Sequence, residues 1–224
     1  MALSRQSITL TTGRANQKQR TRRALIEAAF QLSREGRTPT MPDVAEEALV
    51  SPATAYRYFP NMPALMLEVA TRESQPRIDD VLAALPEDPE DRIDTLVSTV
   101  SGFQFENEAL WRAVLSAILE RWQAQVDVPE PERVPIRGSH RLESVATALA
   151  PLVETLPPDQ HRRLIMATTL VCGVEAMVSA RDACGLDPAE AKEVIRWAAR
   201  ALQRAAVQES RSGRGAEVPE TVAS

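Results

Sequence analysis

The stretch TMPDVAEEALVSPATAYRYFPN, residues 40–61, contains two sets of helix-start signals close together. Thr40 is a preferred N-cap residue, and Asp43 stands three positions later, where an acid completes a capping box. This pair predicts a helix over about 41–48.

The second half of the stretch predicts another short helix after a tight turn at Leu49 and Val50. Ser51 is a second N-cap residue, and Pro52 occupies the first helical position, where its missing N–H costs nothing. Pro60 ends this helix, because the residue before a proline avoids the helical region. Two short helices joined by a tight turn and preceded by a longer helix form a helix-turn-helix unit.

The rest of the chain is also predicted to be helical. Apolar residues recur every three and four positions, and β-hairpin signals do not occur. Prolines and glycines fall between the periodic segments, as expected for helix boundaries. We therefore predict an all-α fold of about nine helices, over 17–34, 41–48, 52–59, 61–82, 89–102, 106–125, 139–155, 158–183 and 188–207.

Charge is distributed unevenly along the chain. Residues 1–60 contain nine basic and five acidic residues, a net charge of +4, whereas the remainder contains 17 basic and 26 acidic ones, a net charge of −9. This asymmetry predicts an N-terminal part that meets a polyanion, with a merely solvated arm as the alternative. The first six charged residues are all basic: Arg5, Arg14, Lys18, Arg20, Arg22 and Arg23.

In a helix-turn-helix unit the second helix enters the major groove of DNA. Small residues at its start approach base edges, and hydroxyls and a guanidinium along its side reach phosphate oxygens. A basic segment before the first helix follows the backbone or enters the minor groove. The residues that we expect to contact DNA are Lys18, Arg20, Thr40, Ser51, Pro52, Ala53, Thr54, Tyr56, Arg57 and Tyr58.

Several of these residues have a second interpretation. Tyr56 and Tyr58 could pack on the helix surface, and Arg57 could pair with Glu47 or remain solvated. Phe59 is expected to face inward and contact the first helix.

The segment from about 21 to 70 resembles the DNA-binding domain of the TetR family of transcriptional regulators. The resemblance rests on TRRALIEAAFQLSREG and on TMPDVAEEALVSPATAYRYFPNMPALMLEVA, and it covers about the first third of the chain. It implies an all-helical homodimer that binds an operator and responds to a small molecule. Three features depart from the family pattern. Leu49 stands where the turn usually has glycine, Met62 stands where a phosphate-binding lysine is common, and Pro52-Ala53 replaces the glycine or lysine often seen after the serine.

The resemblance also implies a division of the chain. We expect a disordered basic arm at 1–15, a helix-turn-helix domain at 16–62, a helical effector-binding and dimerisation domain at 63–207, and a disordered tail at 208–224.

An effector pocket among the middle helices is implied by the same resemblance. For each residue the alternative is ordinary core, since an apolar stripe at helical spacing is core by default. Glu175 lies in an apolar run and needs a partner, either a ligand or an arginine from another helix. The expected pocket residues are Phe103, Phe105, Leu110, Trp111, Leu115, Trp122, Met166, Thr169, Cys172, Gly173 and Glu175.

The last two helices carry a stripe of apolar and small residues that favours a four-helix bundle across a two-fold axis. The alternative is that the stripe covers only its own chain. The expected dimer interface consists of Val174, Val178, Val194, Trp197, Ala198, Ala201, Leu202 and Ala205.

These features predict a DNA-binding regulator, a repressor released from double-stranded operator DNA by an unidentified small-molecule effector. The alternative is an all-helical ligand-binding or interaction protein whose helix-turn-helix no longer binds DNA. We expect no enzymatic activity, cofactor or metal, because no catalytic or ligating constellation occurs. Two cysteines, the lack of a signal sequence and the lack of a long apolar run favour a cytoplasmic protein without a membrane partner.

Overall fold

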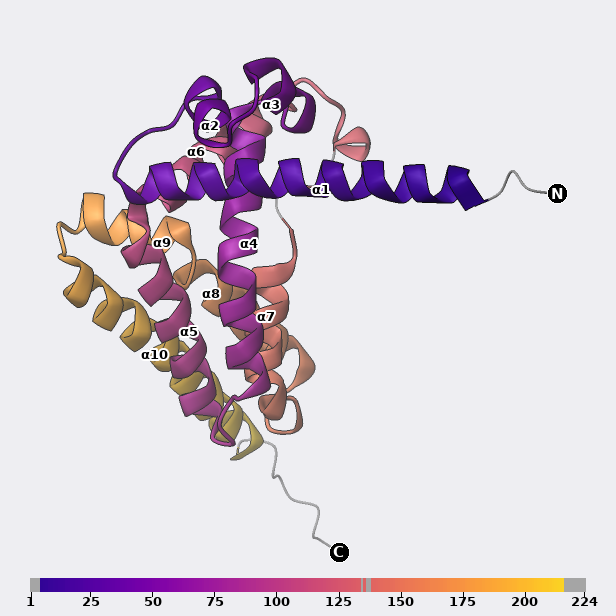
Figure 1. Ribbon diagram of the computed structural model, residues 1–224. Coiled ribbons are helices and arrows are strands. Elements are labelled where there is room, and N and C mark those ends of the chain that lie inside the picture. The colour runs from indigo at the N-terminus through magenta and orange to yellow at the C-terminus, as the bar shows by residue number, and fades with distance from the viewer. Residues whose placement is uncertain (1–4, 134, 136–137, 216–224) are drawn as a thin grey trace, which may run out of the picture. The chain divides into compact units, whose positions relative to one another are not determined.

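The computed structural model describes residues 5–133, 135 and 138–215 (Figure 1). Over these residues it contains ten α-helices and no strand, which confirms the predicted all-α fold with one helix more than expected. The helices are α1 (Arg5–Arg34), α2 (Met41–Glu47), α3 (Pro52–Tyr58), α4 (Met62–Ala83), α5 (Pro89–Glu106), α6 (Glu108–Gln123), α7 (His140–Leu149), α8 (Pro158–Val171), α9 (Val174–Val178) and α10 (Pro188–Gly215). Short 3₁₀ segments lie at Glu130–Glu132 and Ala150–Glu154, and a π-helical turn follows α9 at Ser179–Ala183.

The helices form two compact units. The first contains residues 1–73 and 107–133, and therefore α1 to α3, the first half of α4, and α6. The second contains residues 74–106 and 134–224. This division differs from the expected one, which ended the first domain at residue 62 and assigned α6 to the second.

The first helix is longer than its sequence signals indicate. It begins at Arg5, whereas periodicity predicts a start near Gln17, so residues 5–15 are helical rather than an irregular arm. Residues 1–4 of that expected arm lie outside the described part of the chain. The buried residues of α1 include Leu25, Ala28, Ala29 and Leu32, at helical spacing.

The last helix also exceeds its predicted length. Residues 208–215, expected in a disordered tail, continue α10, and residues 216–224 lie outside the described part. Conversely, the single helix expected over 158–183 is divided into α8, α9 and the π-helical turn, with a bend of 48° at the break.

Gly173 lies at that break. Gly173 has an extended backbone (φ −119°, ψ 178°) and precedes α9 as its N-cap. A Cβ at this position would lie 1.4 Å from Nη1 of Arg141, a residue of α7. The absence of a Cβ leaves room for the Arg141 guanidinium beside the Gly173 backbone, a contact between distant residues that no periodicity argument reveals.

The α2–α3 turn is built around a residue in the left-handed region. Leu49 has φ 55° and a side chain that is 92% exposed. Its N–H donates to the Glu46 carbonyl (3.0 Å), and the Val50 N–H donates to the Ala45 carbonyl (2.9 Å). These two hydrogen bonds are those of a Schellman motif, which usually places glycine at the position that Leu49 occupies.

Replacing Leu49 with glycine should therefore stabilise the first unit by about 1 kcal/mol, because glycine adopts positive φ without a Cβ penalty. Urea unfolding measures this free energy. Leu49→Ala is the matched control, since it shortens the same exposed side chain but keeps the Cβ. Equal stability of the glycine and alanine variants would show that positive φ at position 49 carries no such cost.

The core of the second unit lies between α5, α7, α8 and α10. Its buried apolar residues form one cluster, and α10 packs against both α5 and α8. The cluster consists of Ile93, Leu96, Val97, Val145, Ala148, Leu149, Leu152, Leu156, Leu164, Cys172, Ile195 and Ala199.

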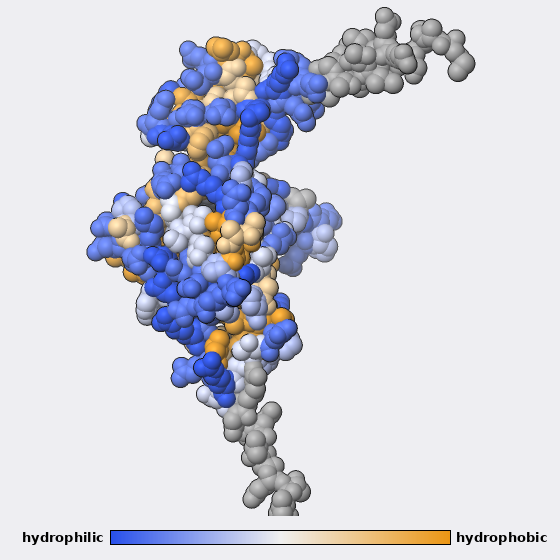
Figure 2. Space-filling model, turned by 60° about the horizontal axis from the view of Figure 1, so that its bottom comes forward, coloured by the Kyte–Doolittle hydropathy of each residue, from blue (hydrophilic) through white to orange (hydrophobic). Residues whose placement is uncertain are grey.

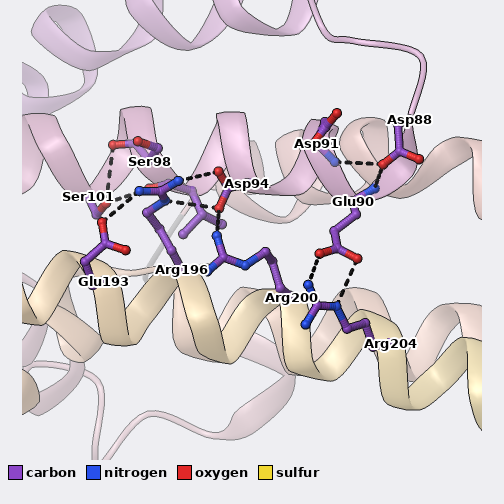
Figure 3. Close-up of polar contacts among 11 residues, drawn as sticks. Asp88, Glu90, Asp91, Asp94, Ser98, Ser101, Glu193, Arg196, Arg200 and Arg204 are labelled. Atoms are coloured by element: carbon purple, nitrogen blue, oxygen red, sulfur yellow. Dashed lines mark hydrogen bonds and ion pairs between the residues drawn. The ribbon is translucent and has the colours of Figure 1, made fainter.

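A row of ion pairs joins α5 to α10 beside this core (Figure 3). Arg196 binds Asp94 with two hydrogen bonds, Nε to Oδ1 at 3.0 Å and Nη2 to Oδ2 at 2.6 Å. Arg200 donates to the same carboxylate, and Arg204 forms a bidentate pair with Glu90. The three arginines are spaced four apart, so they occupy one face of α10 and fix its rotation against α5.

The hydrogen bond from Arg196, reinforced by Arg200, lowers the pKa of Asp94. A carboxyl whose folded pKa lies below its unfolded value of about 3.9 contributes stability above that pH, and the contribution is lost as the pH falls through the folded pKa. Asp94→Asn should therefore cost about 2 kcal/mol near neutral pH, and the cost should shrink below about pH 4.

Urea unfolding of Asp94→Asn and wild type across this range measures the difference. Asp80→Asn, at an exposed position of α4, controls for loss of a surface charge. A deficit that stays constant into acid would exclude an ionised Asp94 as its source.

Candidate nucleic-acid interface

The start of α3 presents a narrow, polar surface. Ser51 is the N-cap: its Oγ accepts from the Thr54 N–H at 3.2 Å and lies 2.9 Å from Thr54 Oγ1. Pro52 and Ala53 are exposed in the first turn, and Thr54 is half-buried. The side chains here are short, so the backbone of α3 can approach another surface closely.

The outer edge of α3 carries the aromatic and basic side chains. Tyr56 is 50% exposed, Arg57 is exposed, and Tyr58 is half-buried. The Arg57 guanidinium carbon lies 5.7 Å from the centroid of the Tyr58 ring. No ion pair joins Arg57 to Glu47, although the structure describes both residues, and the recorded neighbour of the guanidinium is the Tyr58 ring.

The inner face of α3 is anchored by two residues. Ala55 is fully buried, and Phe59, the C-cap residue, is 2% exposed. The Phe59 N–H donates to the Ala55 carbonyl at 3.0 Å. The expectation that Phe59 faces inward is therefore confirmed.

The Phe59 ring is covered by a guanidinium from α1. The Arg22 carbon Cζ lies 4.8 Å from the ring centroid. The same guanidinium holds Glu68 of α4 with two hydrogen bonds, one of them from Nε to Oε1 at 2.7 Å. Three helices thus meet at the end of α3.

Thr40, at the start of α2, forms the complete capping box. Its N–H donates to Asp43 Oδ2 at 2.8 Å, its hydroxyl donates to the same oxygen at 2.7 Å, and it accepts from the Asp43 N–H. These hydrogen bonds from Thr40 lower the pKa of Asp43. Thr40 remains exposed, as do Lys18 and Arg20 on α1.

The residues expected in an effector pocket fall into both units. Leu110, Trp111, Leu115 and Trp122 lie on α6 in the first unit. Leu110 is buried, whereas Trp122 is exposed. The other expected residues lie in the second unit, so the sequence groups residues that the structure assigns to separate packing units.

In the second unit, several expected pocket residues are engaged with their own chain. Phe103 is buried, with the Arg77 guanidinium carbon 4.7 Å from its ring centroid. Phe105 packs against the buried cluster, and Thr169 donates its hydroxyl to the Ile165 carbonyl. Met166 is instead exposed on α8.

Glu175 pairs with an arginine from another helix, which was one of the two alternatives open from sequence. Arg141 Nη1 lies 2.9 Å from Glu175 Oε2, and the guanidinium rests on Gly173. Cys172, next to this pair, is buried, and burial raises the pKa of its thiol to about 11. The thiol therefore stays protonated, which disfavours a redox-sensing role.

The stripe expected at a dimer interface is only partly exposed. Val174 is buried, and Leu202 packs against the cluster of its own unit. Val178, Ala198 and Ala201 are half-buried. Trp197 is 64% exposed and Val194 and Ala205 are also exposed, so these three form the outward part of the stripe.

Sequence reasoning missed a neighbouring exposed residue. Leu170 on α8 is 77% exposed, four positions after Met166. Helices α8 and α10 pack together, and Arg163 of α8 pairs with Glu209 of α10 at 2.8 Å. On the face shown in Figure 2, hydrophilic residues predominate and apolar ones lie in separate patches.

Two further observations concern metals and membranes. Among the described residues, no group of three or more histidine, cysteine, aspartate or glutamate side chains is arranged to hold a metal ion. Within the same residues no single helix is long and apolar enough to span a membrane, although the bent pair Pro158–Val171 and Val174–Ala183 together meets that test.

Comparison with known proteins finds matches to a segment of the first unit. Residues 25–69 match the family model of the bacterial regulatory proteins, tetR family. An uncharacterized HTH-type transcriptional regulator of Haemophilus influenzae is 48% identical over 59 residues. That match covers 25% of this chain and 29% of the relative, so the chain aligns with less than a third of that relative's length.

Solved structures resemble more of the chain. A TetR transcriptional regulator from Rhodococcus sp. RHA1 aligns over 82% of this chain and 96% of its own, with a TM-score of 0.56 and 22% identity. The multidrug binding protein EbrR complexed with imidazole aligns over 79% of this chain and 93% of its own, with a TM-score of 0.46 and 21% identity. The first of these similarities shows a shared fold.

Proposed function

Because residues 25–69 match the family model of the bacterial regulatory proteins, tetR family, we propose that this chain binds double-stranded DNA and regulates transcription. The observation that carries the proposal is the surface of α3. Its capped start is slim, its outer edge bears two tyrosines and an arginine, and its inner face is anchored by Phe59.

Each part of this surface suits one kind of DNA contact. The Pro52–Thr54 turn fits against base edges in the major groove, where methyl groups meet thymine. Arg57 and the tyrosine hydroxyls bind phosphate oxygens, which fix the position on the duplex. Lys18 and Arg20, exposed on α1, add phosphate contacts.

A single α3 offers few contacts, so function requires two copies of the chain. Dimeric helix-turn-helix proteins present two recognition helices about one DNA turn, roughly 34 Å, apart. The exposed side chains of Met166, Leu170, Val194 and Trp197 supply an apolar surface on α8 and α10. We assign this surface to a two-fold homodimer interface, because such helices pair as a four-helix bundle.

Release by a small molecule is the regulatory part of the proposal. Two buried oxygens of the second unit, Thr168 Oγ1 and Gln203 Oε1, have no hydrogen-bond partner among the described residues. Buried polar atoms normally have a hydrogen-bond partner, so a ligand that carries a donor would gain binding energy at either oxygen. A ligand that favours a spacing of the two α3 helices unsuited to DNA must weaken operator binding. By linkage, DNA must then weaken the binding of that ligand.

Leu49 and Met62 motivate the alternative of a unit that no longer binds DNA. The Leu49 turn keeps the two hydrogen bonds that a glycine would make. The replacement of the usual turn glycine by Leu49 therefore affects stability more than the shape of α3. We favour the DNA-binding function for this reason.

Arg57→Ala should weaken binding to DNA from the chain's own promoter by about tenfold and reduce the salt slope by about 1, because one phosphate contact is lost. Tyr58→Phe should weaken binding less, since it removes only a hydroxyl. Gel shifts at several salt concentrations measure both effects. Arg211→Ala, an equal charge change at an exposed position of α10, should match wild type; a loss as large as that of Arg57→Ala would point to nonspecific attraction.

Trp197→Glu should convert the dimer to a monomer and abolish tight operator binding, because a carboxylate would replace an apolar side chain in the bundle. Light scattering after size exclusion measures the mass. Leu119→Glu, at an exposed leucine of α6, is the control and should stay dimeric. A Trp197→Glu variant with unchanged mass would place the interface elsewhere.

A further inference from the structure

Arg22 belongs to the basic start of the chain, yet its guanidinium does not lie free on the surface. It lies over the Phe59 ring and is held by the Glu68 carboxylate. Lys18 and Arg20, on the same helix, are exposed. Position in the sequence alone would place all three cations on DNA.

We propose that Arg22 is a positioning residue that fixes the C-terminal end of the recognition helix α3, and that it does not bind phosphate. The inference rests on the proposed DNA-binding function for its consequence, although its structural part stands without DNA.

The short length of α3 makes such a clamp necessary. Seven residues form fewer than two turns, and a helix so short depends on tertiary contacts for its stability and direction. Its start is held by the Ser51 cap and its middle by Ala55. Its end is held by the buried Phe59, whose extended backbone (φ −133°, ψ 114°) leads the chain away.

The geometry of Arg22 suits a clamp better than lysine would. The guanidinium carbon lies 4.8 Å from the centroid of the Phe59 ring, and two of the guanidinium nitrogens bind the two Glu68 oxygens. A lysine ammonium is a point charge without a planar face or a fork of donors. Because the pair is partly exposed, its value lies in fixing direction more than in adding stability.

Glu68 separates the positioning role from a phosphate contact. If Arg22 bound phosphate, Glu68→Gln would release the guanidinium and remove a negative charge, so DNA binding would stay equal or improve. If Arg22 positions α3, Glu68→Gln must weaken DNA binding, even though the chain becomes more positive. Arg22→Lys keeps the charge and loses the stacked, bidentate geometry.

The first experiment measures promoter-DNA affinity against salt for Glu68→Gln and Arg22→Lys. We expect both to bind about tenfold more weakly with the wild-type salt slope, because no phosphate contact is lost. Glu27→Gln on α1 and Arg211→Lys on α10, both at exposed positions, are the matched controls. Wild-type or tighter binding by Glu68→Gln would overturn the proposal.

The second experiment needs no DNA. Hydrogen exchange of the free protein should be about tenfold faster in Glu68→Gln for the amides of Ala55 to Phe59, while α2 amides keep wild-type rates. Equal acceleration in α2 would indicate general destabilisation and would overturn the positioning role, as would unchanged exchange in α3. If wild type binds no promoter DNA, the proposed function fails, and the exchange result still decides the role of Arg22.

Discussion

The burial of Phe59 is the constraint on which the first unit depends. This side chain ends α3, lies almost completely out of solvent, and is covered by the guanidinium of Arg22. Because its inner face is held in this way, the other face of α3 can remain exposed to solvent. That face carries Pro52, Ala53, Tyr56 and Arg57. A surface that must fit a groove has to be rigid before the partner arrives, because ordering it on binding would cost affinity.

A comparable arrangement organises α10 in the second unit. Its arginines at 196, 200 and 204 bind carboxylates of α5, and their spacing confines them to one side of the helix. Val194 and Trp197 are consequently left on the outside. The polar pairs thus leave Val194 and Trp197 exposed, and these are the side chains that we propose for the interface with a second copy of the chain.

Local signals predicted the elements near the interface well and the long-range features poorly. Thr40 and Ser51 are caps whose partners lie three residues away, so sequence alone located α2 and α3. Helical periodicity favours an uninterrupted helix at Gly173, where the structure has a break, and the Arg141 side chain that lies beside this glycine stands 32 residues earlier. The role of Arg22 was hidden in the same way, because its partners stand 37 and 46 residues further along the chain.

The expected pocket shows the limit of a resemblance confined to residues 25–69. The expected pocket residues lie in two packing units, and the apolar pattern of the sequence did not indicate that α6 packs with α1.

In the proposed function, two copies of α3 contact one operator. Hydroxyl-radical footprinting on promoter DNA tests it most directly: we predict two protected segments on one face, roughly 34 Å apart. A single protected segment, or none at low salt, would contradict it.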